Sequence, residues 1–189
     1  MINRTCVWWK SLVRMPRRVG SVVPSSPQLA GRMAREVTHF LGQKGNGRII
    51  EVGAGTGAIT GALAKLAGAL PLTVVEADRG CCVYLRRRFP HVQVVEGLVE
   101  DALDTLMVPT ERLALVSSVP LFSLTREQRA RVLAAFESLV RSTALAHVVQ
   151  FTYVPWLPEP RAYSLLGNRA QSVWQNLPPA WVWSATHRA

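Results

Sequence analysis

The sequence has few cysteines and no long apolar run. Three cysteines occur, at positions 6, 81 and 82, and no CxxC spacing is present. This pattern predicts neither a disulfide framework nor a metal site, and it fits a reducing, cytoplasmic compartment. No stretch approaches the roughly 18 consecutive apolar residues of a transmembrane helix. The apolar residues near the N-terminus are interrupted at Lys10 and Arg14, which argues against a signal peptide.

Acidic residues are scarce, and none precedes Glu36. The chain carries 22 Lys+Arg against 12 Asp+Glu, a formal net charge of +10. Such an excess predicts an anionic partner, either nucleic acid or an acidic lipid surface, with a merely basic soluble protein as the plainer alternative. Hydrophobic residues make up 49% of the 189 residues, which excludes a disordered chain and suits one folded domain.

Apolar strands and helices alternate from residue 47 to residue 154. This alternation, with mostly continuous apolar strands, predicts an α/β fold with a parallel sheet covered on both faces. Two further apolar segments flank the turn "NLPP" and predict a C-terminal antiparallel hairpin. The predicted strands cover 47–53, 71–78, 91–97, 112–120 and 146–154, and the predicted helices cover 27–42, 56–68, 79–89, 101–107 and 125–140.

The stretch "EVGAGTG" at 51–57 follows the first strand and opens a helix. Its glycines let the backbone turn tightly and approach a ligand. Glu76 closes the next strand, where an acid accepts both ribose hydroxyls of a nucleoside cofactor. Glu51 would repel a dinucleotide's pyrophosphate and suits a cofactor with a cationic amino-acid end. A glycine loop that merely packs helix on sheet, and a nicotinamide enzyme, are the alternatives.

This E-x-G-x-G-x-G pattern resembles class I methyltransferases, and it implies a Rossmann-like fold with a mostly parallel seven-stranded sheet. S-adenosylmethionine is then the cofactor and S-adenosylhomocysteine its product. After the third strand the chain reads "EGLVEDA", in which the acid is displaced and Leu98 is expected to contact the adenine. The predicted cofactor-binding residues are Glu51, Gly53, Ala54, Gly55, Thr56, Gly57, Glu76, Ala77, Gly97, Leu98 and Ser117.

Seven stretches, in order, resemble bacterial phospholipid N-methyltransferases. They are "PRRVGSVVPSS", "EVGAGTGAIT", "VVEAD", "LRRRFPHVQVVEG", "VPLFSL", "QFTYVP" and "NLPPAWVW". The resemblance implies an enzyme that methylates the head-group amine of phosphatidylethanolamine, and of its mono- and dimethyl forms, towards phosphatidylcholine. It also implies a substrate pocket near the loop after the fourth strand, which reads "SSVPLF" here where the family tends to have G-L-P-L.

Aromatic side chains after the fourth and fifth strands suit a methylated ammonium, because aromatic faces bind such cations. We expect Ser118, Pro120, Phe122 and Trp156 to bind the substrate, with Arg161 holding the lipid phosphate. Tyr153 is the candidate catalytic residue, as a hydrogen-bond acceptor for the amine; a role as a core aromatic is the alternative.

Residues 2 to 15 form an amphipathic helix when placed at 100° per residue. Its basic face and boundary tryptophans predict a helix lying on a membrane surface, with packing on the core as the alternative. We therefore expect an N-terminal extension over 1–26 and a methyltransferase domain over 27–189. The predicted membrane-binding residues are Trp8, Trp9, Lys10, Arg14, Arg17 and Arg18.

The expected protein is a monomer on the inner face of the cytoplasmic membrane, without a nucleic-acid partner. Two alternatives stay open: an RNA adenine N-methyltransferase, and a cofactor- and lipid-binding adaptor without catalysis. Against the first, no Asn-rich motif follows the fourth strand. The stretch "NLPPA" at 176–180 is similar to such motifs, but we interpret it as a turn built on Asn176 and two prolines.

Overall fold

The structure, a computed structural model, describes residues 25–42, 47–66, 68–107 and 109–188. The predicted N-terminal helix, with all six predicted membrane-binding residues, lies outside the described residues. No helix in the described ranges combines the length and the apolar character needed to cross a membrane. The predictions about the N-terminal extension therefore stay predictions.

The chain forms one mixed sheet of seven strands in the order β3-β2-β1-β4-β5-β7-β6. The first five strands are parallel, whereas β7 runs antiparallel to both β5 and β6. The predicted parallel sheet and C-terminal hairpin are thus confirmed. The strands are β1 (Arg48–Val52), β2 (Leu72–Glu76), β3 (Gln93–Glu96), β4 (Arg112–Ser117), β5 (Leu145–Thr152), β6 (Ala170–Val173) and β7 (Ala180–Arg188).

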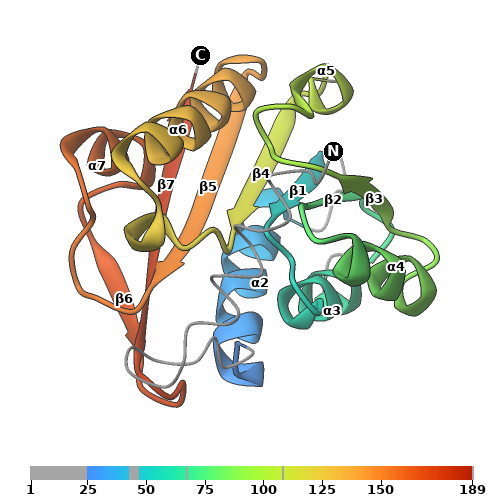
Figure 1. Ribbon diagram of the computed structural model, residues 1–189, viewed down its shortest axis with the longest axis horizontal. Coiled ribbons are helices and arrows are strands. Elements are labelled where there is room, and N and C mark those ends of the chain that lie inside the picture. Colours follow the sequence, from blue (N-terminus) through green and yellow to red (C-terminus); the bar gives the residue numbers. More distant parts are fainter. Residues whose placement is uncertain (1–24, 43–46, 67, 108, 189) are drawn as a thin grey trace, which may run out of the picture.

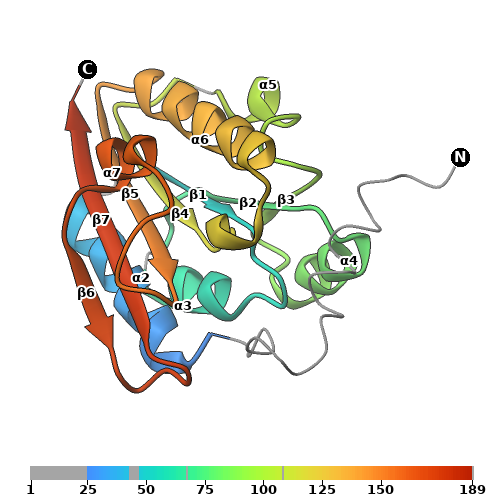
Figure 2. The same cartoon turned by 60° about the vertical axis from the view of Figure 1, so that its left-hand side comes forward.

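Helices cover both faces of this sheet, as Figures 1 and 2 show. One face packs against α2 (Pro27–Leu41), α3 (Ala58–Leu66) and α4 (Arg79–Arg88). The other packs against α5 (Leu103–Leu106), α6 (Arg126–Arg141) and α7 (Pro160–Leu166). The sequence did not predict α7 or the short 3-10 helix at Leu121–Ser123. Helix α7 begins at Pro160 and ends before Gly167, as is usual for helix ends. It is only seven residues long, too short for a clear helical pattern in the sequence.

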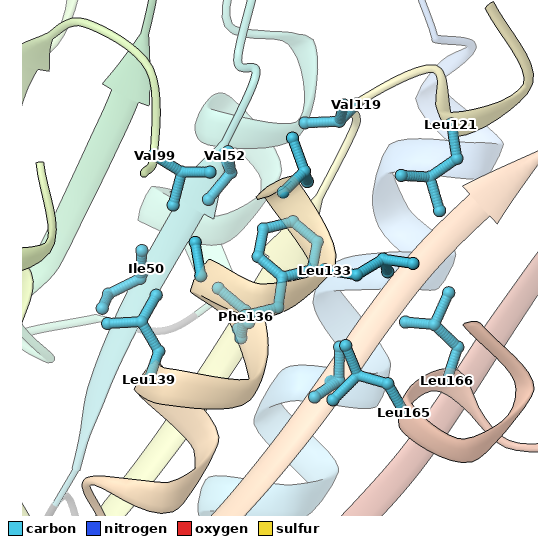
Figure 3. Packing of buried hydrophobic residues seen from close by; sticks show 14 of the residues in the cluster. Ile50, Val52, Val99, Val119, Leu121, Leu133, Phe136, Leu139, Leu165 and Leu166 are labelled. Atoms are coloured by element: carbon cyan, nitrogen blue, oxygen red, sulfur yellow. The ribbon is translucent and has the colours of Figure 1, made fainter. Parts of the chain in front are cut away.

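Both faces of the central strands are buried, because each is covered by a helical layer. Every residue of β1 and of β2 is buried, and Ile49 and Ile50 join opposite cores. Figure 3 shows the larger core, where Phe136 of α6 packs between Leu133 and Leu139 over the sheet. This arrangement explains why the strand sequences are continuously apolar rather than alternating.

The carboxyl ends of the five parallel strands meet at one edge of the sheet, here called the carboxyl edge. Helix α2 begins at this edge, where the Ser26 side chain accepts a hydrogen bond from Leu29 N at 3.2 Å. Helix α6 begins there with a capping box between Thr125 and Gln128. Open α/β sheets bind ligands at this edge, so a ligand site is expected there.

Candidate functional site

The glycine loop joins β1 to α3 at the carboxyl edge. Gly53, Gly55 and Gly57 all have positive φ, at 77°, 55° and 79°. A Cβ on Gly57 would lie 2.7 Å from the Leu85 and Phe89 side chains, so Gly57 lets α3 pack against α4. A Cβ on Gly55 would meet nothing within 4 Å, so this turn of the loop faces open space. The turn delays the start of α3 to Ala58, two residues later than predicted.

Glu76 ties the glycine loop to the next strand. Its side chain is 1% exposed, and Oε2 accepts a hydrogen bond from Gly55 N at 2.7 Å while Oε1 accepts one from Asp78 N at 2.8 Å. Burial raises the pKa of Glu76, and the backbone amides of Asp78, Gly55 and Ala77 oppose that rise. The carboxylate therefore sits at the end of β2 with oxygen lone pairs left to accept ligand hydroxyls.

Glu51 is a fully buried carboxyl two residues before the first glycine of the loop. Burial raises its pKa from 4.5 to about 7, with Glu76 adding to the rise and Thr60 of α3 tempering it. Neither carboxylate oxygen has a hydrogen bond of normal geometry within the described residues. An unpaired buried acid is costly in a folded protein, so this position suits a group that meets a cationic ligand.

A crevice of about 690 Å³ opens at the carboxyl edge between the sheet and α6. This volume is that of a site for a drug-sized or cofactor-sized molecule. Four of the predicted cofactor residues line it: Gly53, Ala77, Gly97 and Leu98. Residues 97–101 thus form one wall of the crevice, and their contact with a cofactor stays a prediction. The other predicted cofactor residues are not among those that line the crevice: Glu51, Ala54, Gly55, Thr56, Gly57, Glu76 and Ser117.

The wall opposite the glycine loop comes from α6 and was not predicted. Glu127, Gln128, Arg131 and Val132 line the crevice from the first turns of that helix. They lie more than 25 residues along the chain from the third strand. No local pattern marks them, because their role depends on how α6 packs on the sheet.

The loop after β4, the predicted acceptor loop, is held by backbone and buried side-chain contacts. Ser118 N donates to Val52 O at 2.9 Å, and Val119 N donates to the Ser117 hydroxyl at 3.2 Å. Ser117 is wholly buried, whereas Val119 lines the crevice. The predicted cofactor contact of Ser117 thus has its hydroxyl already engaged in shaping the loop.

Three exposed aromatic side chains follow β4 and β5 at the carboxyl edge. Phe122 and Trp156 are 41% and 54% exposed, and their rings meet edge to face with centroids 6.5 Å apart. Tyr153 packs edge to face on Phe151 at 5.5 Å. Burial raises the pKa of Tyr153, opposed by its contact with Asn176, so the phenol keeps its proton at neutral pH. Tyr153 can orient an amine by hydrogen bonding, but it is a poor proton acceptor.

The "NLPP" stretch forms the turn between β6 and β7, as predicted. The buried Asn176 accepts a hydrogen bond from Ser26 N at 2.9 Å and donates to Pro178 O at 2.7 Å. Because Thr152 pairs with Trp181, this turn lies at the carboxyl edge, closer to Tyr153 than the sequence indicated. Arg161, by contrast, is bound by both oxygens of Glu137, at 2.6 and 2.7 Å. The predicted phosphate contact of Arg161 would compete with that ion pair.

Solved structures share this architecture over most of the chain. The magnesium protoporphyrin IX methyltransferase of Synechocystis PCC 6803, solved with bound S-adenosylmethionine, matches with a TM-score of 0.64, covering 100% of this chain and 99% of its own at 11% identity. The precorrin-6y C5,15-methyltransferase of Geobacter metallireducens matches with a TM-score of 0.60, covering 86% and 88% of the two chains at 12% identity. The chain has the class I methyltransferase fold. The predicted fold class is thereby confirmed, and the cofactor predicted from the sequence is the one bound in the Synechocystis structure.

Curated relatives with sequence similarity are also methyltransferases. Ribosomal RNA small subunit methyltransferase A of Acidobacterium capsulatum is 30% identical over 141 residues, which are 72% of this chain and 49% of the relative. The protein of the same name from Chlorobium luteolum is 25% identical over 146 residues, 74% of this chain and 50% of the relative. The chain therefore spans about half the length of the curated relatives that it matches. No family model matches the chain.

Proposed function

We propose that this chain is an S-adenosylmethionine-dependent N-methyltransferase. The observation that carries the proposal is the crevice at the carboxyl edge. It is lined by Gly53 and Ala77, which are close in the chain to two buried acids, Glu51 and Glu76. Glu76 would accept the ribose hydroxyls, and Glu51 would face the cationic amino-acid end of the cofactor. When bound, the cofactor supplies an electrophilic methyl group on a sulfonium.

The acceptor we favour is the head-group amine of a phospholipid such as phosphatidylethanolamine. The chain's role is to hold the amine lone pair in line with the methyl group, and such positioning supplies much of the catalysis. Phe122 and Trp156 would present aromatic faces to the ammonium. Tyr153, which keeps its proton, would orient the amine, while water or the lipid phosphate takes the proton that the ammonium releases.

Exposed apolar side chains at the same edge support an approach to a membrane surface. Trp174 and Leu177, in the turn between β6 and β7, are 71% and 81% exposed. Together with Trp156 they give the carboxyl edge an apolar rim, and the net charge of +10 suits an anionic lipid surface. Peripheral binding at the cytoplasmic face, as a monomer, is part of this proposal.

A second candidate acceptor is an adenine amino group in RNA, and the curated relatives favour it. They carry the name ribosomal RNA small subunit methyltransferase A, at 25% and 30% identity. The acceptor loop weighs against it, because the loop offers Ser118, Val119 and Pro120 without an asparagine. The asparagine-containing "NLPP" stretch forms the β6–β7 turn instead.

One assay separates the two acceptors. The protein is incubated with methyl-labelled S-adenosylmethionine, anionic vesicles containing phosphatidylethanolamine, and small-subunit ribosomal RNA, and the lipid and RNA fractions are counted separately. We expect label in the lipid fraction; label in RNA alone would replace the lipid proposal with the RNA one, and label in neither would contradict both.

Variants of Phe122 and Trp156 test whether these two rings contact the acceptor. Phe122→Ala and Trp156→Ala should each lower lipid methylation about tenfold through a weaker contact with the ammonium. Tyr84→Ala, which removes a similarly exposed aromatic from α4, is the matched control and should leave the rate unchanged. Equal rates in all four proteins would remove these rings from the acceptor site.

A further inference from the structure

Gln150 is a buried polar residue beside the acceptor loop to which the sequence assigned no role. It lies on β5, is 0% exposed, and pairs in register with Ser117 of β4. Its side-chain Nε2 donates to Val119 O at 3.1 Å and to Phe151 O at 2.7 Å. The side chain therefore fixes the carbonyl of Val119, an acceptor-loop residue that lines the crevice.

These two hydrogen bonds determine how the amide is oriented. An amide nitrogen has two N–H donors, and both are used here. A flipped amide would place Oε1 against two carbonyl oxygens, so the hydrogen-bond network permits only the observed orientation. Oε1 is consequently left as a pure acceptor, and it is buried without a donor in the described part of the chain.

A second buried polar group without a partner lies on the acceptor loop itself. The Ser118 hydroxyl also has no partner among the described residues, although the Ser118 backbone is held to Val52. A buried polar group that has lost its water without gaining another partner costs free energy. Neither side chain is among the residues that line the crevice, but Val119, which Gln150 holds and which follows Ser118, does line it. A ligand that reaches past Val119 and donates hydrogen bonds would complete both groups.

We propose that Gln150 Oε1, together with the Ser118 hydroxyl, accepts hydrogen bonds from an N–H of the acceptor amine. This inference rests on the proposed N-methyltransferase function and names the feature of the acceptor that the site reads. An amine that still carries an N–H satisfies these groups, whereas a fully methylated amine cannot. The site therefore favours substrate over final product, for a lipid ammonium and for an adenine amino group alike.

The test compares two ligands that differ only in N–H content. The full chain is saturated with S-adenosylhomocysteine to prevent turnover, and the affinities for dihexanoyl phosphatidylethanolamine and dihexanoyl phosphatidylcholine are measured by titration calorimetry. Gln150→Met should weaken binding of the ethanolamine lipid about tenfold and that of the choline lipid less than twofold. A general loss of structure would weaken both equally, and that result would overturn the inference.

Two further variants keep the test decisive. Ser118→Ala removes a hydroxyl without a hydrogen-bond partner among the described residues, so it should fold normally and show the same selective loss. Thr73→Val removes buried hydrogen bonds to Arg48 and Gln93 away from the carboxyl edge, and should change neither affinity.

The remaining outcomes separate this inference from the proposed function. If the wild type binds RNA in place of lipid, the same comparison is made with an adenosine oligonucleotide and its N6,N6-dimethyladenosine form. Binding of neither amine by the wild type would overturn the function and this inference together. A wild type that transfers methyl groups, with Gln150→Met and Ser118→Ala leaving both affinities unchanged, would overturn this inference alone.

Discussion

Replacement of Glu51 by glutamine should stabilise the empty protein above neutral pH. The carboxyl is fully buried, and its pKa is raised from 4.5 to about 7. Between these values the folded state holds a proton that the unfolded state has lost, so stability falls as the pH rises through this window. At about 1.36 kcal/mol per pH unit, the whole window corresponds to roughly 3 kcal/mol. Glu51→Gln removes that loss because an amide does not ionise.

Urea denaturation of the wild type and of Glu51→Gln at pH 5 and pH 8 measures the effect. The variant should gain roughly 3 kcal/mol at pH 8 and under about 1 kcal/mol at pH 5. Asp104→Asn, which neutralises an exposed carboxyl on α5, is the control and should stay within about 0.5 kcal/mol at both pH values. The same Glu51→Gln protein should bind S-adenosylhomocysteine more weakly, since the cofactor's ammonium loses its charge partner. A stability gain that is equal at the two pH values would refute the reasoning.

Substitutions at two glycines and at one core aromatic give further predictions. Each is a change in the free energy of unfolding, measured by urea denaturation. Gly57→Ala should cost roughly 2–4 kcal/mol, because a positive φ and close contacts with α4 both oppose the new methyl group. Gly55→Ala has a positive φ but open space, so it should cost about 1 kcal/mol; equal losses at the two glycines would contradict this account. Phe136→Ala empties the centre of the larger core and should cost about 3–5 kcal/mol, with a loss below about 1 kcal/mol arguing against that packing.

Much of the fold follows from local patterns in the sequence. Continuous apolar strands such as β1 and β2 predicted a sheet buried on both faces, and the capping residues placed the starts of α2 and α6 within a residue. The short helix α7 was not predicted, because its seven residues are too few to show a clear helical periodicity.

In the candidate site, too, some residues could be predicted from local sequence and others could not. Glu51, Glu76 and the glycines lie within one β-α-β unit, so their spacing placed them together. Contacts that cross the fold were not predictable: α6 closes the crevice, Glu137 binds Arg161 across 24 residues, and Gln150 reaches Val119 from another strand. Each depends on how elements pack, which no local period encodes.

Titration of S-adenosylhomocysteine into the full chain tests the central claim most directly. The account predicts micromolar binding to the wild type and a loss of at least about tenfold in Glu76→Ala, which removes a carboxylate that would accept ligand hydroxyls and that orders the glycine loop through Gly55. Absence of binding to the wild type, or unchanged affinity in Glu76→Ala, would contradict the assignment of this crevice as the cofactor site.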